Sequence, residues 1–259
     1  MISACDSRLV SAIHPSPCCE PRRGYGRPDM LLLHYTGMMS CERAIDWLSR
    51  PEARVSCHYV IDVDGTITQM VAEDQRAWHA GVSAWAGETD INSCSVGFEI
   101  HNPGHDQGYP EFPEAQMVAV EALAADVVRR WSIAPERVLA HSDVAPARKI
   151  DPGEKFDWRR LAAAGIGLWV PPVPIDPTDE GFAPGARDDM IATAQDLLRC
   201  YGYAIETTGE IDIATSLVLA AFQRHFRPAR VDGRLDPSTL ATIERLLAAL
   251  GRQEPLDNA

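Results

Sequence analysis

The sequence predicts an α/β protein with a mixed central sheet flanked by helices, followed by a small C-terminal domain of three helices. Short apolar runs alternate with helical patterns over residues 28–165, which is typical of a single α/β domain. A proline-rich stretch interrupts this alternation, and helical spacing resumes near the end of the chain. The length of 259 residues is sufficient for one large domain or two modest ones.

The elements expected in the first domain follow from hydrophobic spacing and turn residues. The apolar run "DMLLLHY" predicts a buried central strand, and "SCHYVIDVDGTITQMV" predicts a hairpin because Asp64-Gly65 is a strong turn dipeptide. Ser40 precedes an acidic first turn and helical spacing, so a helix is expected there. In chain order we expect a strand over 29–35, a helix over 40–50, the hairpin over 56–71, a strand over 93–102, a helix over 114–131, a strand ending at His141 in "PERVLAHSD" and a helix in "KFDWRRLAAAG".

Composition divides the chain into an arm, two domains, a linker and a tail. The N-terminal residues contain Pro, Gly and Arg at close intervals, which predicts an irregular arm over the surface. The stretch "GIGLWVPPVPIDPTDEGFAPGA" contains five prolines and little periodicity, which predicts a stiff linker. We therefore expect an arm over 1–27, the α/β domain over 28–165, a linker over 166–186, a helical domain over 187–250 and a tail over 251–259.

The C-terminal segment contains a faint internal repeat. "GEIDIATSLVLAAF" and "GRLDPSTLATIERL" share a Gly-x-aliphatic-Asp turn, a threonine and an apolar helix. Asp212 and Asp236 are placed to cap the helix N-termini, and Pro237 occupies a first-turn position. Two such units predict a small helical module of about sixty residues, a size typical of an accessory domain.

Charge and hydrophobicity argue against two classes of protein. The net charge of −13 argues against a nucleic-acid-binding protein, which needs a basic surface. No apolar run reaches the roughly eighteen residues that a membrane-spanning helix requires.

The cysteines and the N-terminus predict a cytoplasmic protein. Seven cysteines, an odd number without framework spacing, favour reduced thiols. No apolar segment typical of a secretory signal is present near the N-terminus. The stretch "ISAC" at Ile2 to Cys5 resembles the end of a lipoprotein cleavage box. A start further upstream would make it a lipobox and would place the protein in the periplasm or at the outer membrane.

Three residues form a candidate metal site. "AHSDVAPARKIDPG" places His141 and Asp151 ten residues apart on a loop that doubles back, and His34 ends the predicted central strand. Zinc binds His nitrogens and carboxylate oxygens, and a catalytic zinc site uses three protein ligands and keeps a fourth position open. Each histidine could instead be a surface or hydrogen-bonded residue, and Asp151 could be a turn former before Pro152.

Two further ionisable residues fit hydrolysis at such a site. Lys149 precedes Asp151 by two residues, so in an extended segment both project to the same side, where the lysine could stabilise an oxyanion. Glu99 in "VGFEI" lies in an apolar strand, where an unpaired carboxylate is costly to bury. It is either a structural ion-pair partner or the group that takes and returns a proton during hydrolysis, with a raised pKa.

Several motifs occur in order over residues 28–170 with consistent spacing: "LLLHYTG", "HYVIDVDGTITQMV", "RAWHAG", "NSCSVGFEIHN", "FPEAQ" and "AHSDVAPARKIDPGEKFDW". Together they resemble the zinc-dependent N-acetylmuramoyl-L-alanine amidases of the AmpD/AmiD type, which are relatives of the bacteriophage lysozyme-amidases and the peptidoglycan recognition proteins. The later stretch "AAFQRHFRPARVDGRLDPSTLATI" resembles a peptidoglycan-binding helical module, which the AmiD branch carries.

The resemblance implies an activity, a cofactor and a set of site residues. The activity is hydrolysis of the amide between the lactyl group of (anhydro-)N-acetylmuramic acid and L-alanine of the stem peptide, in peptidoglycan turnover or muropeptide recycling. It implies one Zn2+ per chain, and peptidoglycan or muropeptides as partners. The implied roles are zinc ligation by His34, His141 and Asp151, catalysis by Glu99 and Lys149, and substrate binding by Trp78 and His79 of "AWHAG".

The remaining histidines are expected to be structural or exposed, and two alternative functions stay open. "AWHAG" could instead be a packed turn, His58 is expected to be structural, and four histidines without motif support are expected to face solvent: His14, His101, His105 and His225. A non-catalytic peptidoglycan recognition protein and a zinc peptidase acting on the stem peptide are the alternative functions. The presence of all three zinc ligands with Glu99 and Lys149 favours an enzyme over a recognition protein.

Overall fold

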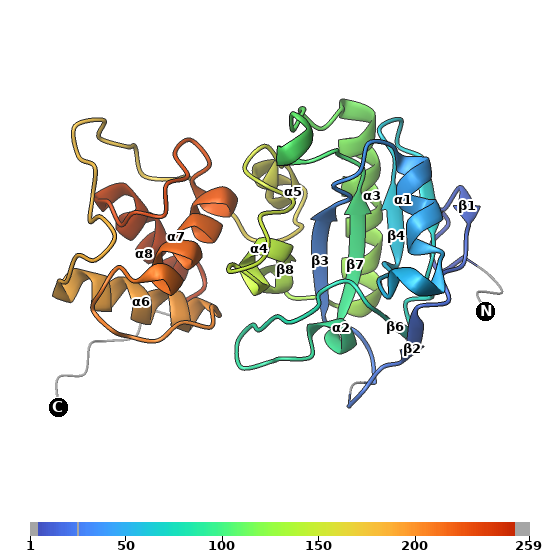
Figure 1. Cartoon of the computed structure of the whole chain (residues 1–259), viewed down its shortest axis with the longest axis horizontal. Helices are drawn as coiled ribbons and strands as arrows, with labels where there is room; N and C mark the ends of the chain where they lie inside the picture. Colours follow the sequence, from blue (N-terminus) through green and yellow to red (C-terminus); the bar gives the residue numbers. More distant parts are fainter. Residues whose placement is uncertain (1–4, 25, 252–259) are drawn as a thin grey trace.

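The structure is a computed structural model that describes residues 5–24 and 26–251. A sheet domain and a helical C-terminal domain lie side by side, as Figure 1 shows. Most of the "ISAC" stretch and the predicted tail beyond residue 251 lie outside the described residues. Within the described ranges, no helix combines the length and the apolar character needed to cross a membrane.

The first domain is built on a six-stranded sheet, which is mixed, as the sequence predicts. Its order is β1-β5-β4-β7-β3-β8, in which only the β4–β5 pair is antiparallel. The strands are β1 (Ala12–Ile13), β3 (Met30–Tyr35), β4 (Tyr59–Ile61), β5 (Ile67–Gln69), β7 (Ser95–Ile100) and β8 (Val138–Ala140). A separate antiparallel pair joins β2 (Cys19–Pro21) to β6 (Gln75–Ala77).

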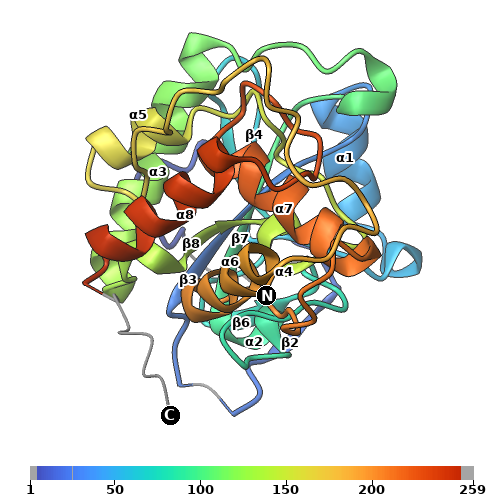
Figure 2. The same cartoon turned by 90° about the vertical axis from the view of Figure 1, so that its left-hand side faces the viewer.

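Strand β3 is apolar because both of its faces are covered. Leu31 and Leu33 belong to the core beneath helix α3 (Glu114–Trp131). Met30 and Leu32 belong to a second core that continues into the C-terminal domain. Figure 2 shows the C-terminal helices in front of the sheet domain. The two domains therefore share one continuous apolar interior.

The remaining elements of the first domain are short. They are the helices α1 (Cys41–Leu48), α2 (Ile91–Cys94), α4 (His141–Val144) and α5 (Trp158–Ala163), and the 3-10 turns Pro51–Ala53, His105–Gln107 and Pro135–Arg137. Helix α1 begins at Ser40, whose side chain accepts a hydrogen bond from the Arg43 N–H, in agreement with the expected start.

Several elements differ from the sequence-based expectation. The N-terminal arm is partly regular, because its backbone hydrogen-bonds to the edge of the sheet, as in Ser11 N–H to the Ile67 carbonyl at 2.8 Å. His141 does not end a strand: it is the first residue of α4. The reason is that the Asp143 carboxylate accepts the Ala140 N–H at 2.8 Å, which starts a helical turn directly after β8.

The C-terminal domain contains α6 (Asp189–Tyr201), α7 (Ile213–Phe226) and α8 (Pro237–Ala249). Asp212 and Asp236 cap α7 and α8 by accepting the N–H groups of Thr215 and Thr239, as predicted. The region over 166–186 has little regular structure, and Val173 in it exchanges hydrogen bonds with two side chains of α8.

The predicted repeat has a structural basis in two buried glutamines. Gln195 on α6 accepts the Thr208 and Gly209 N–H groups, and Gln223 on α7 accepts the Asp232 and Gly233 N–H groups. Each glutamine also donates to the threonine in the first turn of the next helix. The same turn is therefore fixed in the same way before α7 and before α8.

Candidate metal centre and active site

His34, His141 and Asp151 meet at one point beside the sheet. His34 lies near the end of β3, His141 begins α4, and Asp151 lies in a turn after it. The Nδ1 atoms of the two histidines are 2.8 Å apart. The Asp151 Oδ2 lies 3.2 Å from His34 Nδ1 and 3.0 Å from His141 Nδ1. All three side chains are buried.

This group fits a divalent metal ion. Its three ligand atoms lie within 4.8 Å of one another. Burial and the neighbouring His141 lower the pKa of His34 to about 4, so its imidazole is neutral at neutral pH, the form that binds a metal. Burial raises the pKa of Asp151, but the two histidines outweigh it and hold the pKa below its usual value. Two imidazole nitrogens and one carboxylate oxygen match a catalytic zinc site.

The second nitrogen of each ligand histidine is held by the "AWHAG" segment. His34 Nε2 lies 3.0 Å from His79 Nδ1, and His141 Nε2 lies 3.1 Å from the Ala80 carbonyl oxygen. Asn92 fixes this segment because its Oδ1 accepts the N–H groups of both His79 and Ala80. Donation from the Nε2 atoms leaves both Nδ1 atoms free to bind a metal.

His79, which was predicted to bind substrate, lines the cleft described below and also contacts His34. The residue is 8% exposed, and its Nε2 faces the Ser95 hydroxyl at 3.3 Å. Its ring lies against Gly97 of β7, where an added Cβ would come within 2.5 Å of His79 Nδ1. Glycine at position 97 therefore makes room for the His79 ring, which supports His34 through the contact between His79 Nδ1 and His34 Nε2. Spacing alone could not reveal this, because the support depends on a contact between β3 and a distant turn.

Glu99 lies beside the candidate ligands on the neighbouring strand. Residue 99 of β7 is in register with His34 of β3. Burial, and then the negative charge of Asp151, raise the pKa of Glu99 well above its usual value, and the Lys149 ammonium lowers it. Its Oε2 is buried and has no hydrogen-bond partner among the residues that the structure describes. A carboxyl group of this kind suits proton transfer better than a structural ion pair.

An open cleft connects these residues. Its volume is about 630 Å³, and its lining includes Glu99, Lys149 and Asp151 as well as Trp78. Lys149 and Trp78 are half-buried. Trp47 and Val55 add apolar surface to the same cleft. The structure thus brings Glu99 and Lys149 to one cavity with two of the candidate ligands, His141 and Asp151. The roles of Glu99, Lys149, Trp78 and His79 stay predictions.

Two of the four histidines expected to face solvent are buried. His101 lies against the Thr36 hydroxyl, and His225 on α7 contacts Asp143 of the first domain. These expectations were wrong, because both rings satisfy polar partners that are distant in sequence. His14 is exposed, His105 is half-buried, and His58 is buried with its Nδ1 accepting the Gly97 N–H.

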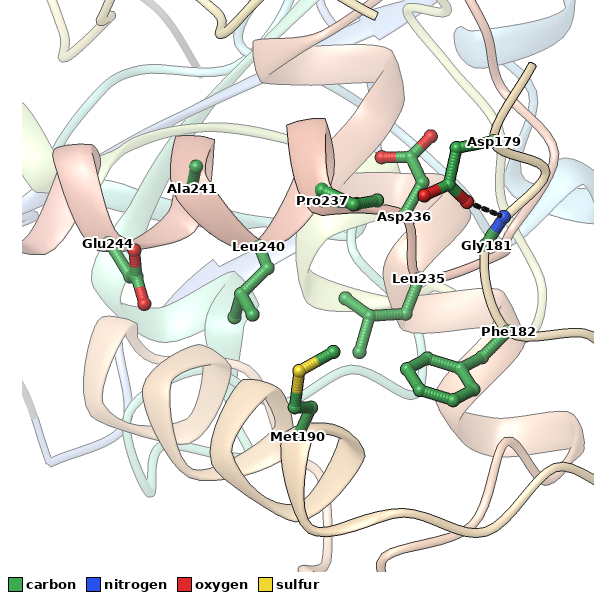
Figure 3. Close-up of a pocket in the computed structure, with 10 residues that line it drawn as sticks. All are labelled: Asp179, Gly181, Phe182, Met190, Leu235, Asp236, Pro237, Leu240, Ala241 and Glu244. Atoms are coloured by element: carbon green, nitrogen blue, oxygen red, sulfur yellow. Dashed lines mark hydrogen bonds between the residues drawn. The ribbon is translucent and has the colours of Figure 1, made fainter. Parts of the chain in front are cut away.

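A second pocket lies in the C-terminal domain. Its volume is about 480 Å³, and Figure 3 shows apolar side chains on its floor and carboxylates near its edge. Its lining comprises Asp179, Gly181, Phe182, Met190, Leu235, Asp236, Pro237, Leu240, Ala241 and Glu244. No residue of the candidate metal centre lines it.

The fold and the site together define a class of enzyme: a metal-dependent hydrolase in which a mixed sheet carries a two-histidine, one-carboxylate metal-binding group beside an open cleft. Comparison with known proteins identifies the family within this class. Residues 24–154 match the family model for N-acetylmuramoyl-L-alanine amidase, and residues 187–243 match a putative peptidoglycan binding domain.

Similar proteins cover both domains. The chain is 36% identical to the N-acetylmuramoyl-L-alanine amidase AmiD of Escherichia coli (strain K12), over 90% of this chain and 87% of that protein. The solved complex of E. coli AmiD with the substrate anhydro-N-acetylmuramic acid-L-Ala-D-gamma-Glu-L-Lys superposes with a TM-score of 0.74 and 35% identity, over 90% of this chain and 94% of the other. AmpDh3 of Pseudomonas aeruginosa gives a TM-score of 0.73 and 33% identity, over 90% and 96%.

The chain belongs to the N-acetylmuramoyl-L-alanine amidase family, and it carries a peptidoglycan-binding domain at its C-terminal end. It is an N-acetylmuramoyl-L-alanine amidase, a hydrolase of peptidoglycan turnover that cleaves between muramic acid and L-alanine of the stem peptide. Membership of this family favours the amidase over the recognition protein and the stem-peptide peptidase.

Proposed function

We propose that the amidase uses one zinc ion held by His34, His141 and Asp151. The observation that carries this proposal is the convergence of two Nδ1 atoms and one carboxylate oxygen within 3.2 Å of one another. Zinc in this group would supply Lewis-acid chemistry, because it lowers the pKa of water and polarises a carbonyl group. Each ligand histidine keeps its Nε2 hydrogen-bonded to the "AWHAG" segment, which fixes the orientation that such a site requires.

Glu99 moves the proton in this mechanism. Its carboxylate accepts the proton of the attacking water as the lactyl carbonyl becomes tetrahedral, and then donates it to the L-alanine nitrogen as the stem peptide leaves. The raised pKa and the unpartnered Oε2 support this role, since a carboxyl group must hold and release a proton near neutral pH. The position in register with His34 places the group beside the metal ligands.

Lys149 stabilises the charge of the tetrahedral oxyanion. It lies in the cleft with Glu99 and Asp151, and an ammonium group directed at developing negative charge typically contributes a few kcal/mol to catalysis. Trp78 provides an apolar surface for the substrate in the same cleft.

The substrate class is a muramyl peptide, with an anhydromuramyl peptide as the first candidate. The E. coli AmiD and P. aeruginosa AmpDh3 structures contain anhydromuramic peptides, and these proteins resemble this chain over both domains. The cleft volume of about 630 Å³ is of the size expected for a small ligand.

The C-terminal domain attaches the enzyme to polymeric peptidoglycan, and we place the contact at the pocket in Figure 3. Its apolar floor suits the methyl groups of stem-peptide alanines, and the carboxylates of Asp179 and Glu244 suit the free amine of a diamino acid. Leu240→Asp should therefore reduce co-sedimentation with insoluble peptidoglycan, while hydrolysis of a soluble muropeptide stays unchanged. Equal co-sedimentation of wild type and Leu240→Asp with peptidoglycan would exclude this pocket as the binding site.

We also propose that the protein is located in the cytoplasm. Cys18, Cys41, Cys57 and Cys94 are buried free thiols, and a reducing cytoplasm keeps such thiols in this form. Fractionation of cells carrying the natural gene, with cytoplasmic and periplasmic markers, tests the placement. Recovery of the protein with the envelope would reverse it.

The amidase mechanism is tested by product analysis with wild type and Glu99→Gln. Wild type should contain one zinc per chain and convert an anhydromuropeptide into intact anhydromuramic acid and a stem peptide with a free L-alanine amino group. Glu99→Gln should retain the zinc and lose activity by about 100-fold or more. Cleavage within the stem peptide would instead identify a peptidase, and full activity of Glu99→Gln would remove Glu99 from the mechanism.

A further inference from the structure

Asp143 connects the helix that carries His141 to the C-terminal domain. It lies two residues after His141 on α4 and is 1% exposed. Its Oδ1 accepts the Tyr203 hydroxyl at 2.7 Å, and its Oδ2 accepts His225 Nδ1–H at 2.7 Å and the Ala140 N–H at 2.8 Å. Both of its side-chain partners, Tyr203 and His225, belong to the C-terminal domain and are themselves 1% exposed.

These contacts are set in an aromatic interface between the two domains. The ring of His225 stacks on Trp158 with centroids 3.8 Å apart, and Tyr203 contacts Trp85 with centroids 4.8 Å apart. The Ala86 N–H donates to the Gly202 carbonyl at 2.7 Å. Tyr203 and His225 are therefore held in place by the first domain as well as by their own.

Helix α4 is too short to be stable without contacts to neighbouring elements. It contains four residues, fewer than a helix needs for stability on its own. It lies between β8 and α7 in Figure 1, and α7 is in contact with it. The neighbouring residue Arg224 on α7 also approaches Glu154, three residues after Asp151, with Nε and Oε2 at 3.9 Å. The C-terminal domain thus contacts both segments that carry metal ligands after residue 140.

We propose that Tyr203 and His225 are positioning residues of the amidase. Through Asp143 they fix α4, and α4 presents His141 Nδ1 to the metal. The C-terminal domain then has a second role beside polymer attachment: it completes the support of the metal centre. This inference rests on the proposed metal ligation by His34, His141 and Asp151.

The test measures zinc affinity in the full-length protein. Tyr203→Phe removes one hydroxyl and keeps the ring, and His225→Phe keeps the stack on Trp158 while it removes the N–H donor. We expect the double variant to raise the zinc Kd about tenfold, measured by competition with a chelator, and Tyr203→Phe alone to raise it less. The visible absorption of the cobalt-substituted protein, which reports ligand geometry, should shift in the same variants.

Gln195→Leu is the matched control. It removes a buried hydrogen-bonding side chain of the C-terminal domain whose partners, such as Thr208 and Thr215, all lie within that domain. It should lower the Tm and leave the zinc Kd and the cobalt spectrum unchanged. An unchanged Kd and spectrum in folded Tyr203→Phe would overturn the inference, as would an equal loss of affinity in Gln195→Leu. If wild type itself binds no zinc, the proposed function fails instead.

Discussion

His34 and His141 reach the same point from supports of very different strength. His34 belongs to a six-residue strand that is paired along its length with β7 and with β8 on its other side. His141 begins a four-residue helix after a three-residue strand. His34 is therefore positioned by the sheet itself, whereas His141 depends on contacts with side chains that are distant in sequence.

The "AWHAG" segment supports both ligands, but in different ways. It meets His34 through the ring of His79, and it meets His141 through the backbone carbonyl of Ala80. A substitution can remove the first contact and leaves the second in place. A support of His141 that substitutions can remove is Asp143 with its partners in the C-terminal domain.

The largest expected effect follows the removal of a ligand. Asp151→Ala deletes the only carboxylate of the group, so zinc should not be retained and hydrolysis should fall by about 1000-fold or more. Metal analysis and muropeptide hydrolysis measure the two effects. His14→Ala, at an exposed histidine, is the control and should match wild type. Zinc content equal to wild type in Asp151→Ala would contradict the ligand assignment.

Lys149 should affect the rate without affecting the metal. Lys149→Met should lower kcat about 100-fold, because an oxyanion partner acts mainly in the transition state, while zinc content stays at one per chain. The chain has one other lysine, Lys155, whose Nζ donates to the Tyr109 carbonyl at 2.7 Å, and Lys155→Met is the control. A rise in KM with unchanged kcat would assign Lys149 to ground-state binding instead.

His79 should act on the His34 side of the site. His79→Ala removes the acceptor of His34 Nε2–H, so the zinc Kd should rise about tenfold with a smaller loss of kcat at saturating metal. His101→Ala removes another buried histidine, whose Nδ1 contacts the Thr36 hydroxyl, and should leave the zinc Kd unchanged. A large rise in KM for the substrate in His79→Ala, with normal zinc binding, would contradict this support role and favour the predicted substrate-binding role.

Much of the fold and the candidate ligand set could be predicted because the signals are local. The apolar strand up to His34, the Asp64-Gly65 turn and the capping residues Asp212 and Asp236 depend only on their near neighbours in sequence. The loop that carries Asp151 was found through its motif, although the start of α4 at His141 was not.

The supports of the site could not be predicted because they join distant segments. His225 is 82 residues from Asp143, and Tyr203 is 60 residues from it. The residues near His225 in sequence do not indicate whether its ring is buried against a carboxylate from another segment or exposed. His225 was therefore wrongly expected to face solvent. His79 was found as a residue, but its contact with His34 required the close approach that Gly97 permits.

The most direct test of the divided support is a double-mutant cycle on zinc affinity. The Kd would be measured for wild type, His79→Ala, Tyr203→Phe and the double variant, in the full-length protein. The account predicts that each single variant weakens zinc binding and that the two effects add in free energy, because the substitutions act on different ligands. A wild-type Kd in either single variant, or a double variant no weaker than His79→Ala, would contradict it.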